Sequence, residues 1–175
     1  MNILNKLISW LDRLAPINIP ILPLHKEGGS KQATQIPEYK TKFASCMDVC
    51  AYIEHDKSKK DWYQDTFIMV DPGKSTTIPT GFCLGVPEGW EVQIRPRSGL
   101  SKNHGINAIL GTIDSDYRGQ VHVILDNITE TAYKVHHGDR IAQMVPKRSK
   151  RARLIVVDKL SETERGAGGF GHTGK

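Results

Sequence analysis

Cysteine and aromatic residues are scarce in this chain, and it contains no long apolar run. Its three cysteines among 175 residues are too few for the disulfide framework of a small secreted domain. Cys46 and Cys50 lie in a predicted strand, so their Cα atoms should be roughly 13 Å apart, beyond the ~7 Å that a disulfide spans. Neither has the paired Cys or His partners of a zinc site. We therefore expect three buried, reduced thiols in a cytoplasmic protein.

The apolar content is moderate, and no apolar run approaches the length that crosses a bilayer. These features exclude a membrane-spanning protein and are typical of a small soluble one. The sequence has no internal repeat and no heptad pattern. Its length fits one domain with its own core. The net charge of +5 favours an anionic partner, although solubility alone would also explain it.

Residues 1–15 predict an amphipathic helix that Pro16 ends. Charges interrupt the apolar positions and no small-residue cleavage site follows, so a signal peptide is not predicted. The helix would pack on its own subunit or on a neighbour, and docking to a membrane surface is the alternative. Residues 26–36 predict a loop. The apolar residues at helical spacing are Ile3, Leu4, Leu7, Ile8, Trp10, Leu11 and Leu14.

From about residue 40 the pattern is all-β. Short apolar or alternating runs are separated by turn signals that contain Gly, Pro, Asn and Asp. Many short strands at close spacing predict a barrel or sandwich, within a domain that spans residues 16–164. Residues 56–65, dense in Lys and Asp, predict an exposed excursion. The predicted strands are Thr66–Val70, Ser75–Pro79, Gly81–Val86, Glu91–Arg95, Gln120–Leu125, Ile141–Val145 and Leu154–Val157.

The stretch from Gly111 to Gly119 carries the most chemistry. Two carboxylates, a tyrosine and an arginine lie between glycines, directly before an alternating strand pattern. A turn alone would need only Asn-Gly or Pro-Asp-Gly. This tight β-connection instead offers a possible general base, a stacking surface and an anion contact. A purely structural hairpin is the alternative.

Two further segments place donors next to predicted strands. In residues 95–100, Pro96 fixes the approach of the chain, and Arg97, Ser98 and Gly99 suit a phosphate oxygen. A solvated turn explains these residues equally well. In residues 138–143, Asp and Arg favour a local structural ion pair, and Gln143 could point its amide into a pocket.

The glycine-rich C-terminal residues 165–175 predict a mobile tail. Phe170 has no core to enter there, so a plausible role is to stack on a ligand. Part of the tail matches a Walker A loop, but no Ser or Thr for magnesium and no helix follow Lys175, so we reject that interpretation. The basic run of residues 147–153 favours a solvated loop over a nucleic-acid patch, because no aromatic residues alternate with it.

Taken together, five segments in this order resemble the five motifs of the trimeric dUTP diphosphatase (dUTPase) family. The resemblance runs from about residue 19 to the C-terminus, and the ordered set is specific although each motif alone is modest. The segments are Met47-Asp48-Val49, Pro96–Leu100, Gly111–Gly119, Gly138–Gln143 and Arg165–Gly174.

The resemblance implies a jelly-roll-like β-barrel subunit in a homotrimer, with each active site built from three chains. It implies hydrolysis of dUTP to dUMP and diphosphate, with Mg²⁺ bound by the triphosphate. This reaction removes dUTP from the nucleotide pool and supplies dUMP for thymidylate synthesis. A protein partner through residues 1–15 is compatible with it, and a nucleic-acid partner is not expected.

For the nucleoside, the resemblance implies that Asp114 is the general base, which deprotonates a water for in-line attack on the α-phosphorus. Tyr117 would pack against the deoxyribose and exclude a 2′-hydroxyl. Backbone groups in residues 108–113 would read uracil and reject cytosine. Ala108, Thr112 and Ile113 belong to that hairpin, and His122 on its arm lies at a position that the family sometimes uses for ligand contact.

For the phosphates, the resemblance implies contacts from Arg97, Ser98 and Gly99 of a second chain, with Gln143 nearby. Asp48 would hold magnesium-bound water. Arg165 would clamp the terminal phosphate, while Phe170 and Gly171 close over the nucleotide. Positive groups aimed at the leaving diphosphate would stabilise the transition state. We expect Asp116 and Arg118 to form a structural pair.

The sequence departs from the family pattern in three places. In the first motif, Ser45-Cys46-Met47 replaces the usual Ala-Gly-Tyr before the Asp, which affects the local backbone and the metal contact. His172 stands where Ser is usual, which could make phosphate contact pH-dependent. Residues 1–15 and 56–65 lie outside the common core.

Two other function classes stay open. A related enzyme of the same fold acts on dCTP, but family deaminases place a catalytic Glu in the hairpin and lack the closing Phe. A nucleotide-gated regulator would bind a partner protein through the extra segments. The intact Asp114 argues against loss of activity.

Overall fold

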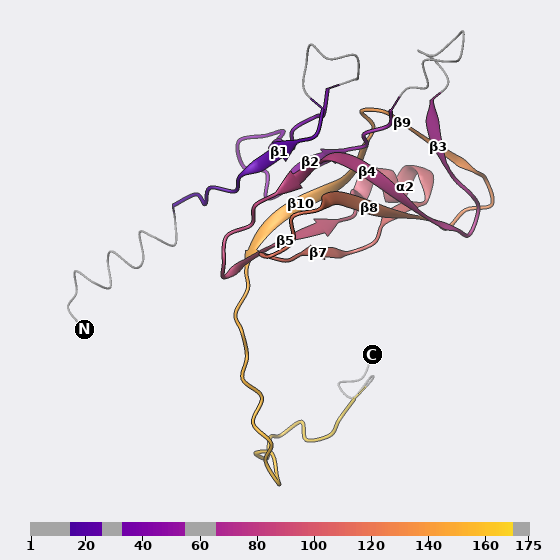
Figure 1. Cartoon of the computed structure of the whole chain (residues 1–175). Helices are drawn as coiled ribbons and strands as arrows, with labels where there is room; N and C mark the ends of the chain where they lie inside the picture. The colour runs from indigo at the N-terminus through magenta and orange to yellow at the C-terminus, as the bar shows by residue number, and fades with distance from the viewer. Residues whose placement is uncertain (1–14, 26–32, 55–65, 170–175) are drawn as a thin grey trace.

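The computed structural model describes residues 15–25, 33–54 and 66–169, and its regular structure is almost entirely β (Figure 1). The first sheet has the order β1-β4-β8-β6 and the second β2-β10-β5-β7, while β3 pairs with β9. One short helix, α2 (Ser98–His104), follows β5. The strands are β1 (Ile21–Pro23), β2 (Met47–Cys50), β3 (Phe67–Val70), β4 (Ser75–Leu84), β5 (Trp90–Arg95), β6 (Ile106–Ala108), β7 (Gly111–Ile113), β8 (Gln120–Asn127), β9 (Tyr133–His136) and β10 (Arg140–Arg148).

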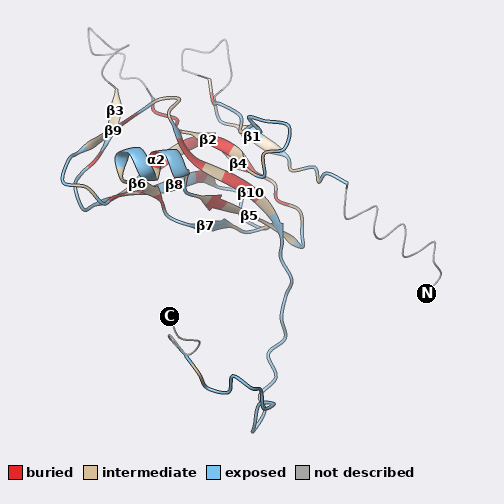
Figure 2. Ribbon diagram, turned by 180° about the vertical axis from the view of Figure 1, so that it is seen from behind, coloured by how far each residue is buried: buried red, intermediate tan, exposed pale blue. Residues whose placement is uncertain are grey.

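The buried faces of the two four-stranded sheets contribute to the hydrophobic core. The core residues follow from the alternation of buried and exposed side chains along the strands. Along β8, Val121, Val123 and Leu125 are fully buried, whereas His122 and Ile124 between them are exposed. This period of two is the pattern of a strand with one face on the core. Figure 2 shows buried residues along the strands and exposed residues along the segment that follows β10.

The all-β prediction is confirmed, but the described residues form separate sheets rather than one closed barrel. Most predicted strands are present, and Ser75–Pro79 and Gly81–Val86 join into the single strand β4. The predicted strand Leu154–Val157 is wrong. These residues have no regular structure, and Val156 is 99% exposed. An apolar run becomes a strand only when a partner strand takes its backbone hydrogen bonds.

The cysteines are less buried than predicted. Cys46, Cys50 and Cys83 are free thiols, as expected, but each is only partly buried. The predicted helix of residues 1–15 and the excursion of residues 56–65 fall almost entirely outside the described residues. In the described part of the chain, no helix is long and apolar enough to cross a membrane.

Candidate active site

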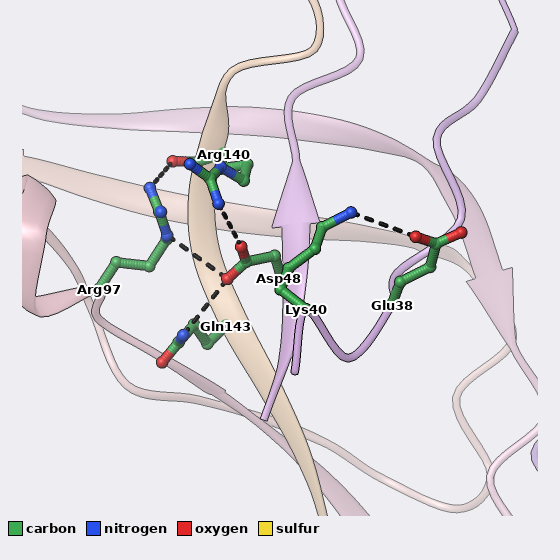
Figure 3. Close-up of polar contacts among 6 residues, drawn as sticks. All are labelled: Glu38, Lys40, Asp48, Arg97, Arg140 and Gln143. Carbon is green, nitrogen blue, oxygen red and sulfur yellow. Dashed lines mark hydrogen bonds and ion pairs between the residues drawn. The ribbon is translucent and has the colours of Figure 1, made fainter. Parts of the chain in front are cut away.

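A buried carboxylate organises the first group of site residues (Figure 3). Asp48 on β2 is only 7% exposed. Its Oδ2 lies 3.0 Å from Nη1 of Arg140, and its Oδ1 lies 3.5 Å from Nε of Arg97. The side-chain amide of Gln143 donates to Oδ1 at 3.3 Å. A buried charge is tolerable only when it is paired in this way.

The sheet explains why residues so far apart in sequence meet here. β10 lies between β2 and β5, and Gln143 on β10 pairs with both Asp48 on β2 and Arg95 on β5. Arg97 follows β5 by two residues, at the point where α2 begins. Ser98 and Gly99 stand exposed in the first turn of α2. Gln143 and Arg97 therefore meet at Asp48, whereas Ser98 and Gly99 remain open to solvent.

The predicted ion pair between Asp139 and Arg140 is wrong. Asp139 instead accepts a hydrogen bond from the backbone N–H of His136 at 2.7 Å, and its Oδ2 lies 3.6 Å from Nδ1 of that histidine. Arg140 turns to Asp48. Asp139 lies just before β10, and its carboxylate is engaged by His136 instead. Arg140 is the site residue that sequence reasoning missed.

The second group of site residues lines a cleft of about 220 Å³ next to β7. Asp114 is exposed at its edge, and the turn that it begins is closed by a hydrogen bond from the N–H of Tyr117 to its carbonyl, at 3.2 Å. The structure thus brings together five predicted site residues. The lining consists of Thr112, Ile113, Asp114, Tyr117, Gln120 and His122.

Residues 111–125 do not form a simple hairpin. β7 pairs with β5 in one sheet, whereas β8 pairs with β4 and β6 in the other. The loop therefore crosses between sheets and does not close a hairpin. β7 is also the last strand of its sheet. In the described residues its outer edge has no strand partner, and such an edge presents backbone donors and acceptors. Ala108, in β6, is buried.

Tyr117 is held in place by its hydroxyl and by a glycine. The hydroxyl donates to the carbonyl of Gln120 at 2.9 Å. A Cβ atom at Gly119 would lie 2.5 Å from that hydroxyl oxygen, so only glycine leaves room for the ring. Nδ1 of His122 lies 2.9 Å from the same carbonyl. Because a carbonyl only accepts, His122 donates from Nδ1 and keeps Nε2 for another partner.

The predicted pair between Asp116 and Arg118 is wrong. Nη1 of Arg118 donates to the carbonyls of Ser115 and Tyr117, at 2.7 and 2.8 Å. Arg118 still supports the loop, but through its backbone rather than through a carboxylate. Within the described ranges no ion pair joins Arg118 to Asp116.

Asp114 also borders a second cleft, of about 410 Å³. That cleft contains the carboxylates of Glu88, Glu91 and Asp116 beside Arg151. Several carboxylates so close together repel an anion. An anionic ligand therefore fits the cleft beside Tyr117 better, although that cleft is the smaller of the two.

The two groups of site residues are separate within one chain. Across the described residues, no hydrogen bond or ion pair joins the Asp48 group to Asp114 or Tyr117. Residues 149–169, here called the C-terminal arm, leave the body of the subunit after β10 (Figure 1). Arg165 on the arm is exposed, and its Nε donates to the carbonyl of Gly168 at 2.9 Å. Phe170, Gly171 and His172 fall outside the described residues.

The residues present do not form a metal site by themselves. In the described part of the chain, no group of three or more His, Cys, Asp or Glu side chains is placed to hold a metal ion. Both oxygens of Asp48 already accept from cationic or amide groups, so this carboxylate does not fit a direct metal ligand. Burial, and then the Asp48 charge, raise the pKa of the Cys50 thiol. Cys50 is therefore poorly suited to act as a nucleophile.

Comparisons with known proteins agree on one family. The dUTPase family model matches residues 61–174. A deoxyuridine 5′-triphosphate nucleotidohydrolase of Desulfotalea psychrophila is 47% identical over 150 residues, which are 85% of this chain and 93% of that protein. The protein of the same name from Finegoldia magna is 44% identical over 83% of this chain and 95% of its own length.

Solved structures share the fold. A mutant dUTPase of Staphylococcus bacteriophage 80alpha, solved with dUpNHpp, aligns with a TM-score of 0.74 and 22% identity, over 90% of this chain and 99% of that chain. A mutant dUTPase of phage phi11, described with a structural Mg(II) ion, aligns with a TM-score of 0.67 and 17% identity, over 83% of this chain and 100% of that chain. The family model and the close relatives cover most of the sequence, and the chain belongs to the dUTPase family.

Proposed function

We propose that this chain hydrolyses dUTP to dUMP and diphosphate. The observation that carries the proposal is the exposed Asp114 carboxylate beside the small cleft that Tyr117 and β7 line, in a member of the dUTPase family. The curated relatives carry the name of this activity. The reaction lowers the concentration of dUTP and yields dUMP, the precursor for thymidylate synthesis.

Asp114 is the proposed general base. Its side chain is exposed at the start of the turn that ends at Tyr117, so both a water molecule and a bound nucleotide can reach it. The carboxylate would accept a proton from the water as that water attacks the α-phosphorus in line with the leaving diphosphate. The nucleophile is water, and no side chain of the protein becomes phosphorylated.

Selectivity for deoxyuridine rests on the strand edge and on the tyrosine ring. Among the described residues the outer edge of β7 has no strand partner, so its backbone groups would be offered to the uracil edge. A cytosine would leave such groups mismatched. Tyr117, fixed through Gln120 and by the space at Gly119, would pack on the deoxyribose. His122 has Nε2 available for the sugar, and Thr112 and Ile113 complete the cleft.

The phosphates would bind to the Asp48 group. Arg97 offers a guanidinium, Ser98 an exposed hydroxyl and Gly99 an exposed backbone. Gln143 pairs with Asp48 across the sheet and donates its side-chain amide to that carboxylate. Charge-assisted hydrogen bonds from arginine are the strongest contacts that a protein makes to phosphate oxygens.

We propose a homotrimer with shared active sites because the described residues of one chain do not complete a site. The cleft of about 220 Å³ is below the roughly 300–1,000 Å³ of typical ligand pockets. The phosphate-binding group is separate from it. The arm also exposes Leu154 by 93% and Val156 by 99%, and such apolar segments mark contacts with other molecules. On another subunit, the arm would bring Arg165, Phe170 and Gly171 to the nucleotide.

Mg²⁺ is the proposed cofactor, and it would arrive with the triphosphate, since the described side chains do not form a cage for it. When bound, it would neutralise phosphate charge. A contact from Asp48 through water stays a prediction. The cytoplasmic location likewise stays a prediction.

The proposed function is tested by measuring diphosphate release with Mg²⁺ from dUTP, dCTP, dTTP and UTP. We expect dUTP to be turned over far faster than the other three. Faster turnover of dCTP would point to the related dCTP enzymes. Absence of diphosphate release from all four would refute the proposal. Ammonia release from dCTP would then point to a deaminase, and absence of ammonia as well would favour a nucleotide-gated regulator.

A further inference from the structure

A β-bulge in β10 aims two side chains at the same carboxylate. Arg140 pairs with Cys50, whereas Ala142 pairs with Val49 and Gln143 with Asp48. The register therefore shifts between Arg140 and Ala142. In a regular strand, residues three apart point to opposite faces. The extra residue cancels that alternation, so Arg140 and Gln143 both reach Asp48.

Bulges of this kind re-aim side chains and are frequent next to active sites. Here the bulge joins Arg140 to a group that includes the phosphate-binding candidate Arg97. Nη1 of Arg97 also donates to the backbone carbonyl of Arg140, at 2.7 Å. The position of the Arg97 guanidinium is thus set by Asp48 at one nitrogen and by the bulged segment at another.

We propose that Arg140 is a positioning residue for phosphate binding, which acts by sharing the Asp48 carboxylate with Arg97. This inference rests on the proposed function and names a residue that the resemblance does not assign. Its ligand is the polyphosphate part of a nucleoside triphosphate.

The electrostatic reason is the balance of charge at Asp48. One carboxylate faces two guanidiniums, so the group has one positive charge more than it has negative ones. Without Arg140, the carboxylate would neutralise Arg97 alone and draw it inward. The 3.5 Å separation between Asp48 and Arg97, against 3.0 Å for Arg140, fits a carboxylate that binds Arg140 more tightly. Arg97 then keeps donors for a ligand.

The test compares Arg140→Gln with Arg140→Lys, which keeps the charge. Arg148→Gln is the matched control, because Arg148 is on the same strand but lies over the Trp90 ring, 5.0 Å from its centroid. Binding of dUMP and of the non-hydrolysable analogue α,β-imido-dUTP is measured by calorimetry at low and high salt. The side chain of Arg140 is half-exposed, so its replacement should be tolerated. Arg140→Met is the second variant if the glutamine protein does not fold.

We expect Arg140→Gln to weaken binding of α,β-imido-dUTP about tenfold, the size of one charge-assisted contact. Binding of dUMP should change much less, and the loss should shrink at high salt. KM for dUTP should rise while kcat stays close to that of the unmodified protein, because Asp114 is untouched. Arg140→Lys should restore most of the affinity, and Arg148→Gln should leave it unchanged.

Equal loss of dUMP and imido-dUTP binding, independent of salt, would overturn the proposal and leave a purely structural role. Unchanged binding of both ligands would also overturn it. Neither result tests the proposed function, which is judged from turnover of dUTP by the unmodified protein. If that protein releases no diphosphate yet Arg140→Gln still weakens triphosphate binding, only the proposed function fails.

Discussion

Gly119→Ala is expected to displace the tyrosine that recognises the sugar. The new Cβ atom would lie 2.5 Å from the hydroxyl oxygen of Tyr117, 2.7 Å from Cζ and 3.1 Å from Cε2. Carbon atoms in contact are normally ~3.5–4.0 Å apart. Because Tyr117 is 43% exposed, its ring can swing outward, and the backbone need not move.

The cost to folding and the cost to recognition should be similar, each about 1 kcal/mol. Swinging out breaks the hydrogen bond from Tyr117 to the carbonyl of Gln120, which contributes about 1 kcal/mol to the free energy of unfolding. A positioned aromatic contact is worth about 0.5–1.5 kcal/mol. KM for dUTP should therefore rise about two- to tenfold, and the preference for dUTP over UTP should fall by a similar factor.

Gly73→Ala is the matched control. Gly73 has a φ of +64° with nothing within 4 Å of the added Cβ, so alanine there costs about 1–2 kcal/mol through backbone strain alone. Steady-state kinetics with dUTP and with UTP give KM and the sugar preference. Urea unfolding at fixed protomer concentration gives the free energy of unfolding. The reasoning fails if Gly119→Ala leaves both KM and the sugar preference unchanged, or if Gly73→Ala alters them equally.

Three further outcomes follow from the same geometry. Asp114→Asn should lower turnover of dUTP at least about a hundredfold with little change in nucleotide binding, measured by diphosphate release and calorimetry; near-normal turnover would refute its role as base. Removal of residues 165–175 should abolish most activity and leave the oligomer intact, checked by size-exclusion chromatography with light scattering; full activity would contradict the proposed closing tail. Asp48→Ala should lower the free energy of unfolding by about 2–4 kcal/mol, because it leaves Arg97 and Arg140 without their shared carboxylate; a urea midpoint like that of the unmodified protein would contradict this.

The sequence predicts the fold best where alternation is long and one face is buried. β8 is an example, because Val121, Val123 and Leu125 face the core at every second position. The short strand β7 gives no such signal, because its 3 residues are too few to show an alternating pattern. The apolar run Leu154–Val157 gives a false signal, because its residues alone do not reveal whether a partner strand exists.

The same distinction applies to the site. Asp114 and Tyr117 lie in one short segment, so their proximity could be predicted from the sequence and is confirmed by the shared cleft. Asp48 and Arg140 are separated by 92 positions, and they meet only because a bulge shifts the register of β10. No local sequence pattern indicates that bulge. For this reason the sequence favoured an ion pair between Asp139 and Arg140.

The most direct test of the account follows the oxygen atom that enters the product. A single turnover of dUTP in water labelled with heavy oxygen, analysed by mass spectrometry, identifies the phosphorus that is attacked. Attack by the water that Asp114 activates predicts the label in the phosphate of dUMP and none in the diphosphate. Label in the diphosphate would contradict the account, because the water would then have attacked a different phosphorus.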